Sequence, residues 1–114
     1  MLPKEYRLKK RSAFSATYKT GKTLHKDGVT VFIGKAKNND YPTRVGFVVS
    51  KKIHKRAVKR NRIKRLMRES YRLLIKEETV SDKYVSLIFV ASSKLLDKTF
   101  KEVDEAVRKL VYKL

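Results

Sequence analysis

The residues best suited to chemistry in this sequence lie together at positions 51–68, in the stretch KKIHKRAVKRNRIKRLMR. Ten of these eighteen residues are Lys or Arg, and none is acidic. Cations clustered along one segment are the footprint of a surface that binds nucleic acid. The chemistry that this stretch favours is therefore the docking of phosphates, and not the making or breaking of bonds.

Side chains that could carry out catalysis are scarce in the rest of the chain. His25 and His54 are the only histidines, there is no cysteine, and no H-x-x-x-H spacing occurs, which argues against a zinc site. The four glycines form no P-loop, and Asp104 with Glu105 indicates a solvated surface rather than a metal-holding carboxylate pair. We expect no catalytic residue in the polypeptide itself, no identifiable metal ligand and no tightly bound cofactor.

The overall composition favours the same class of partner. The chain has 114 residues and a formal net charge of +19, and self-repulsion on that scale favours a polyanionic partner. Hydrophobic residues make up 41% of the chain, enough for one folded domain spanning 1–114. Nothing indicates a membrane: no run of about 18 apolar residues occurs, and the basic N-terminus MLPKEYRLKKRS lacks the apolar segment of a signal peptide. We expect a soluble cytoplasmic protein.

The elements that must position the basic stretch follow from periodicity and turn residues. Ser12 is predicted to cap a helix, AFSATYKT, that ends at Gly21. VTVFIG (29–34) and RVGFVVS (44–50) are rich in β-branched and aromatic residues and predict an antiparallel hairpin, and 22–28 adds a further short strand.

The second half of the chain predicts helix, strand and helix. The basic stretch opens a long helix at 56–77, and YVSLIFVAS (84–92) has the composition of a buried, central strand. Thr99 and Glu102 match a capping box that begins a C-terminal amphipathic helix. The order α-β-β-β-α-β-α predicts an α+β fold, a two-layer sandwich of helices on a sheet.

A helical wheel at 100° per residue separates the roles within the basic helix. An apolar stripe should pack on the sheet: Ile63, Leu66, Met67, Tyr71 and Leu74. A ridge should face solvent: Asn61, Arg65, Arg68 and Arg72. Arg60 and Arg62 fall on opposite flanks, about 160° apart, which suits a folded RNA better than one flat phosphate track.

The first turns of this helix should project beyond the core, because the apolar stripe runs into Arg56, Lys59 and Arg60 there. The free N–H groups at the helix N-terminus also suit phosphate. The alternative is a solvated helix with i,i+4 ion pairs, which is weak because no acidic residue occurs in the helix before Glu69.

A second candidate surface is aromatic. Phe14 and Tyr18 lie four residues apart and share a helix face, and alternation places Phe32 on the sheet face opposite to Val31. If the first helix lies along the sheet edge, the three rings could line a groove that stacks unpaired bases. The alternative, that all three belong to an ordinary core, stays open on the residues alone.

The quoted residues resemble a known family. VGFVVSKKIHKRAVKRNRIKRLMRES, with Arg60-Asn61-Arg62 inside it, resembles the signature of the protein subunit of bacterial ribonuclease P, and YRLKKRSAFSATYKTGK extends the resemblance to the N-terminus. The chain departs from many members in the turn after Ser50-Lys51-Lys52, where it has His54 and one extra residue. This departure affects the shape of that loop and not the assignment.

The resemblance implies a fold, a function and two sites. It implies a left-handed βαβ crossover, and a ribonucleoprotein whose RNA removes the 5′ leader of precursor tRNA with Mg²⁺ that is largely RNA-bound. The residues implied to bind the catalytic RNA are Lys55, Arg56, Lys59, Arg60, Asn61, Arg62, Lys64, Arg65 and Arg68. Those implied to form the cleft for the single-stranded leader are Phe14, Tyr18, Phe32, Lys51 and Lys52, the two lysines being able to serve either surface.

The protein is then expected to strengthen substrate binding and lower the Mg²⁺ requirement, with no obligate protein partner. Two other functions stay open on the residues alone. A general RNA-binding or ribosomal protein would explain the charge but not the aromatic residues. A metal-dependent nuclease acting alone lacks a carboxylate or histidine site.

Overall fold

The computed structural model describes residues 2–80 and 82–114. Within them the elements are α1 (Arg11–Lys19), β1 (Lys22–Lys26), β2 (Val29–Ile33), β3 (Arg44–Val48), α2 (Ala57–Lys76), β4 (Ser86–Ala91) and α3 (Phe100–Tyr112), with short 3₁₀ turns η1 (Lys4–Tyr6) and η2 (Ser93–Leu95). The predicted α+β order is confirmed. Among these described residues, no helix is long and apolar enough to cross a membrane.

The four strands form one sheet in the order β1-β2-β4-β3. β2 pairs with β1 and β4 in antiparallel fashion, whereas β3 and β4 are parallel. The central position predicted for 84–92 is confirmed. The predicted hairpin between 29–34 and 44–50 is wrong, because β4 lies between those strands; local patterns identify strands, but this pairing joins segments far apart in the chain.

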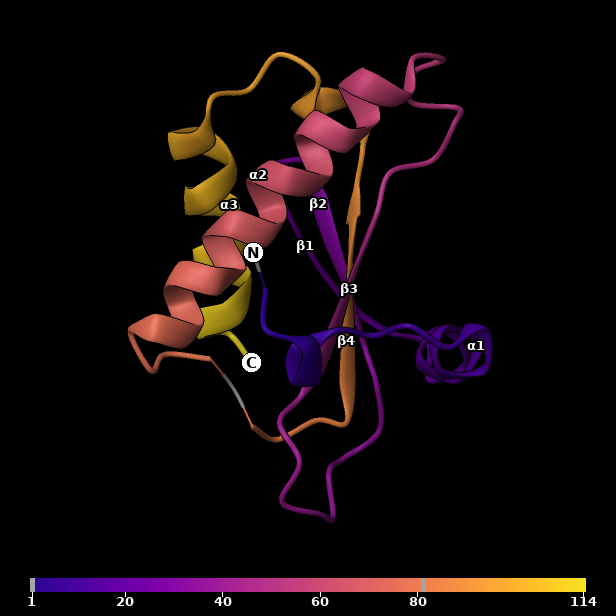
Figure 1. Cartoon of the computed structure of the whole chain (residues 1–114), viewed down its shortest axis with the longest axis vertical. Helices are drawn as coiled ribbons and strands as arrows, with labels where there is room; N and C mark the ends of the chain where they lie inside the picture. The colour runs from indigo at the N-terminus through magenta and orange to yellow at the C-terminus, as the bar shows by residue number, and fades with distance from the viewer. Residues whose placement is uncertain (1, 81) are drawn as a thin grey trace.

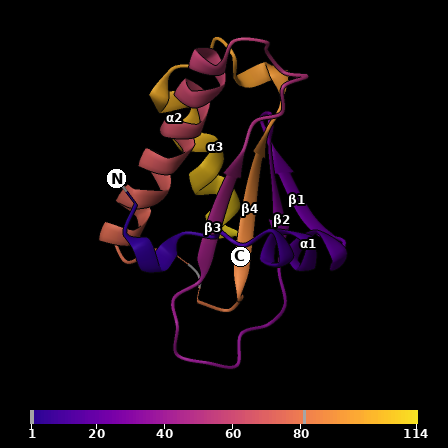
Figure 2. The ribbon, with the colours of Figure 1, turned by 45° about the vertical axis from the view of Figure 1, so that its right-hand side comes forward.

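The path from β3 through α2 to β4 is a left-handed crossover. Seen from the α1 side in Figure 2, with β3 pointing upward, β4 lies to the right of β3 while α2 passes behind the sheet. About 98% of such crossovers in proteins are right-handed. The left-handed path places the start of α2, and therefore the basic stretch, at the upper end of the sheet beside the C-terminal end of β3 (Figure 1).

The two main layers are the sheet and the pair α2 and α3, while α1 crosses the opposite face of the sheet (Figure 1). The core between the layers contains an aromatic cluster in which Tyr71 of α2 lies 5.7 Å from Phe89 and 6.3 Å from Phe47, measured between ring centroids. The predicted stripe of α2 is confirmed, since Ile63, Met67, Tyr71 and Leu74 are buried and Leu66 is half-buried. This stripe packs on α3 as well as on β3.

The predicted strand at 22–28 is confirmed as β1, which forms a tight hairpin with β2. Lys26 pairs with Val29, so the loop consists of Asp27 and Gly28, with φ angles of 47° and 91°. Two positive φ angles are typical of the type I′ turn, for which Asp-Gly is a preferred sequence. The turn fixes the register that directs Thr30 and Phe32 toward the outer face of the sheet, as predicted.

Helix ends agree with the sequence in two of three cases. Gly21 follows α1 with a φ of 70°, as predicted for the residue that ends this helix. The Thr99–Glu102 capping box at α3 is present. The predicted Ser12 cap is wrong: α1 begins two residues earlier than predicted, at Arg11, with Lys10 as N-cap and no side-chain hydrogen bond there.

The C-terminal half of α2 is tied to α3 by a polar network. The Ser70 hydroxyl donates to Asp104 at 2.6 Å, and Arg108 donates to Asp104 at 2.8 Å. The same guanidinium donates twice to Glu77, at 2.9 Å and 2.7 Å. These hydrogen bonds hold the pKa of Glu77 below its ordinary value. Asp104, Arg108 and Glu77 are therefore paired within the fold.

Candidate nucleic-acid interface

The loop that leads into α2 is held in place by the helix itself. Arg60 donates from Nη1 to the carbonyl oxygens of His54 and Lys55, at 2.8 Å and 2.9 Å. The ring nitrogen Nδ1 of His54 accepts from the backbone N–H of Arg56 at 3.0 Å, in place of a side-chain cap from Arg56 itself. The loop and the first turn of α2 thus form one preorganised unit.

His54 is a contributor that the sequence did not identify. The sequence distinguishes His54 only as one of two histidines without metal-ligand spacing and as a departure from the family pattern. Its position two residues before the helix N-cap is the available signal, since a side-chain acceptor in such a place can bind a free N–H group of the first turn.

Arg62 anchors the other flank of the helix. Its Nη2 donates to the carbonyl oxygen of Lys98, in the turn before α3, at 3.1 Å. Arg60 and Arg62 therefore lie on opposite flanks, as predicted, and each uses part of its guanidinium to fix a neighbouring backbone segment. Both side chains are half-buried.

The nine predicted residues form what we call the basic helix surface: Lys55, Arg56, Lys59, Arg60, Asn61, Arg62, Lys64, Arg65 and Arg68. Five are exposed and four are half-buried. In the part of the chain that the structure describes, none of them forms an ion pair with a carboxylate. Val58 is 72% exposed, and the first buried residue of α2 is Ile63, so the first turns project from the core as predicted.

The outer face of the sheet carries the three predicted aromatic residues in one row. The register aligns Phe32 of β2, Ile88 of β4 and Gly46 of β3 across the sheet. Tyr18 meets Phe32 edge-on, with ring centroids 4.8 Å apart. Phe14 covers Gly46, where a Cβ atom would lie only 2.6 Å from the ring. α1 therefore crosses the sheet face at this row, rather than along the sheet edge.

The next row toward the basic helix is not covered by a helix. It consists of His25, Thr30, Val90 and Val48, in which the first residue is exposed and the others are half-buried. We call the aromatic row and this uncovered row the open sheet face. Lys51 and Lys52 are exposed in the segment that joins β3 to α2, which leans toward the α1 side of the sheet (Figure 1). The structure thus brings all five predicted cleft residues to one side of the molecule.

The aromatic residues differ in how much they can offer a ligand. Phe14 is half-buried and closely fitted to Gly46, so packing accounts for much of its surface. Tyr18 is 38% exposed, and partial burial raises the pKa of its hydroxyl, which stays neutral at physiological pH. Tyr18 and Phe32 are therefore the rings better placed to stack on a base.

The residues that the structure describes contain no group of three or more His, Asp or Glu side chains that could hold a metal ion. His25 instead shares a hydrogen bond of 2.9 Å with Thr30. The groups available on this side of the molecule are cations, which bind phosphates, and aromatic rings, which stack on bases.

Comparison with known proteins decides the family. Residues 2–114 match the sequence model of the family described as Ribonuclease P. The chain belongs to the bacterial ribonuclease P protein family. It is 42% identical to the ribonuclease P protein component of Clostridioides difficile over 104 aligned residues. The alignment covers 91% of this chain and 87% of that protein. The component from Thermoanaerobacter sp. is 39% identical over 114 residues, covering 99% and 92%.

Solved structures of ribonuclease P proteins share the fold. The protein from Thermotoga maritima aligns with a TM-score of 0.79 and 26% identity, covering 95% of this chain and 96% of that one. The protein from Staphylococcus aureus aligns with a TM-score of 0.74 and 28% identity, covering 92% and 91%. The chain is thus the protein component of ribonuclease P, an RNA-containing endoribonuclease of tRNA processing.

Proposed function

We propose that this chain docks on the catalytic RNA of ribonuclease P through the basic helix surface and holds the 5′ leader of precursor tRNA on the open sheet face. In this proposal the RNA performs the Mg²⁺-dependent hydrolysis. The observation that carries it is the adjacency of two surfaces of different chemistry. One is a set of cations without carboxylate partners among the described residues, and the other is a row of aromatic side chains near Lys51 and Lys52.

The basic helix surface suits a folded RNA. Arg60 and Arg62 point to opposite flanks while Arg65 lies exposed between them, so phosphates must approach from more than one direction. A structured RNA can meet this condition by surrounding the projecting turns of α2. Because the loop before α2 is already held by Arg60, little ordering entropy remains to be lost on docking.

The open sheet face suits an unpaired strand. Aromatic faces stack on bases with little sequence preference, and nearby cations neutralise the backbone. Tyr18 and Phe32 supply the rings, while Lys51 and Lys52 supply charge where the two surfaces meet. A leader bound there would lie between the protein and the docked RNA.

The contribution of the protein to catalysis would then be electrostatic. Two RNAs repel each other as they approach, and fixed cations between them replace part of the Mg²⁺ otherwise needed for screening. The protein should therefore strengthen binding of the substrate and lower the Mg²⁺ requirement, while the catalytic Mg²⁺ is held by RNA. This role would place the protein in the bacterial cytoplasm with the tRNA precursors.

Reconstitution tests the proposal. The protein is mixed with a bacterial ribonuclease P RNA and a precursor tRNA at an Mg²⁺ concentration where the RNA alone cleaves slowly. We expect the protein to raise the rate of 5′ cleavage. No gain would contradict the proposal and favour a general RNA-binding protein, whereas cleavage by the protein without the RNA would favour a nuclease that acts alone.

A further inference from the structure

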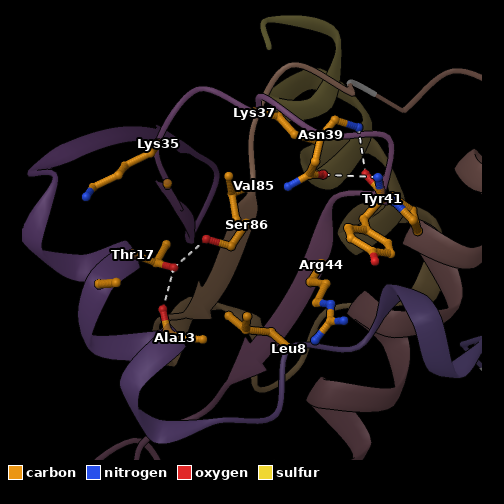
Figure 3. A pocket seen from close by; sticks show the side chains of 13 residues that line it. Leu8, Ala13, Thr17, Lys35, Lys37, Asn39, Tyr41, Arg44, Val85 and Ser86 are labelled. Carbon is orange, nitrogen blue, oxygen red and sulfur yellow. Dashed lines mark hydrogen bonds between the residues drawn. The ribbon is translucent and has the colours of Figure 1, made fainter.

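A cavity on the other side of α1 from the aromatic row belongs to neither surface described above. It has a volume of about 320 Å³, at the small end of ligand pockets, and lies between α1 and the loop at 34–43 (Figure 3). Its floor is apolar, with Leu8, Ala13 and Val85 among the lining residues. The hydroxyls of Thr17 and Ser86 hydrogen-bond to each other at its back and so need no ligand.

The wall formed by the loop is held by several hydrogen bonds, although its sequence, KAKNNDYPT, predicts only turns. Its first residues form backbone hydrogen bonds with the segment before β4, including Val85 N–H to Lys35 O at 2.9 Å. Lys37 is largely enclosed, donates to the carbonyl oxygen of Tyr41 at 2.8 Å and lies 3.5 Å from Asp82. The Asn39 side chain accepts from the backbone N–H of Tyr41 at 3.0 Å. The backbone of Tyr41 is thus fixed from two sides.

The Tyr41 ring remains open to a ligand even though its backbone is fixed. It is 70% exposed, the largest exposure among the tyrosines of the described chain. An exposed ring on a fixed backbone segment offers a stacking surface, and the backbone needs no further ordering when a ligand binds. Figure 3 shows Tyr41 and Arg44 on one side of the cavity and Lys35 on the other.

The charge at the cavity has one sign. Lys35 and Arg44 are exposed and form no ion pair within the described residues, and none of the described residues that line the cavity is acidic. A base on Tyr41 would therefore have Arg44 beside it and Lys35 across the cavity. In an RNA strand each nucleoside is flanked by two phosphates, so this arrangement matches a nucleotide within a strand better than a free nucleotide.

We propose that the cavity between α1 and the loop at 34–43 binds one unpaired nucleotide of an RNA strand, with its base on Tyr41 and its flanking phosphates on Lys35 and Arg44. The inference rests on the proposed function for the class of ligand, since it takes RNA to be the partner. It adds a contact that is separated from the open sheet face by α1.

A titration of the isotope-labelled protein with hexa-adenylate, followed by NMR, tests the inference. We expect the methyl signals of Ala13 and Ala16 in the cavity to shift, and adenosine 5′-monophosphate to bind there at least about tenfold more weakly because it offers one phosphate. Equal affinity for the mononucleotide would overturn the assignment to a strand. Shifts caused by an oligoglutamate peptide but not by RNA would indicate an acidic protein partner instead.

Matched variants keep the test independent of folding. Tyr41→Ala should weaken the cavity response about tenfold, and Tyr41→Phe should retain it, because stacking needs only the ring. Tyr112→Ala removes another exposed tyrosine, on α3, and should leave the affinity unchanged. Equal effects of Tyr41→Ala and Tyr112→Ala would overturn the inference. Lys35→Gln and Arg44→Gln should each make binding less sensitive to salt.

The same spectra separate this inference from the proposed function. If the signals of Tyr18 and Phe32 shift while those of the cavity do not, the open sheet face binds RNA and the cavity inference is wrong. If only the cavity signals shift, the inference holds and the leader must be assigned to another surface. If neither set shifts, both are wrong.

Discussion

The two halves of α2 belong to one helix but treat charge in opposite ways. In residues 57–68 the cations have no carboxylate partner within the described chain, and the first turns project from the core. In residues 69–76 and the turn after them, Glu69 pairs with Arg72, and Glu77 pairs with Arg108 of α3. The described ion pairs of this region thus involve its second half, whereas the first half, anchored in the core by Ile63 and Met67, is the part that we propose binds RNA.

Hydrophobic truncation gives the largest expected difference between the halves. Leu74→Ala should lower the free energy of unfolding by about 2–5 kcal/mol, because the side chain is fully buried. Val58→Ala should change it by no more than about 0.5 kcal/mol, because the side chain is 72% exposed. Urea unfolding followed by circular dichroism measures both. Similar losses would mean that the first turns of α2 are part of the core.

A substitution on the open sheet face tests whether RNA binding extends beyond the first half of α2. Tyr18→Ala in the reconstituted particle should weaken binding of leader-bearing precursor tRNA by about 1–3 kcal/mol, the typical loss for one stacked base. Mature tRNA should bind as before, and Tyr18→Phe should behave like the native protein. Equal losses for precursor and mature tRNA would assign Tyr18 to folding rather than to the leader.

Arg108 of α3, which pairs with Glu77 after the second half of α2, tests whether a paired cation serves stability and not RNA binding. Arg108→Ala removes hydrogen bonds to both Asp104 and Glu77 and should lower the free energy of unfolding by about 1 kcal/mol. Its affinity for ribonuclease P RNA should not change, measured at a temperature where the variant is folded. A large loss of RNA affinity with unchanged stability would reverse the roles of the two regions.

Of the two halves of α2, only the second should contribute to a loss of stability in acid. This is the smallest of the expected effects. Because Arg108 lowers the pKa of Glu77 in the folded state, this carboxylate stabilises the fold above its ordinary pKa of 4.5. That contribution is lost as the pH falls through the lowered value. Glu77→Gln should therefore flatten the fall in melting temperature between about pH 5 and about pH 3. Arg65→Gln, in the first half, should leave that fall unchanged; equal flattening by both would contradict the division.

Periodicity predicted which side of α2 is buried, but not what its flanking arginines bind. The wheel placed Ile63 and Met67 inside and Arg60 and Arg62 on opposite flanks, because these positions depend only on helix geometry. The carbonyl partners of the two arginines lie in a loop and in the turn before α3. Their positions depend on the tertiary fold, which a wheel does not contain.

Strand pairing shows the same limit. The apolar run of β4 correctly predicted a central strand, yet its neighbours could not be derived from local patterns, and β2 was wrongly paired with β3. The left-handed crossover opposes the general preference for right-handed ones and came only from the family resemblance. The cavity beside Tyr41 was missed because its walls come from α1, the loop at 34–43 and the start of β4.

The most direct test of this division compares two arginines of α2 in assembly with ribonuclease P RNA as a function of salt. Arg65 is exposed and unpaired within the described chain, whereas Arg72 is paired with Glu69 at 2.6 Å. Arg62 is less suitable, since its truncation also releases the turn at Lys98. Arg65→Ala should reduce the slope of log affinity against log salt by about 0.7–0.9, as expected for one lost phosphate contact. Arg72→Ala should leave the slope unchanged; an unchanged slope for Arg65→Ala, or equal reductions for both, would contradict the account.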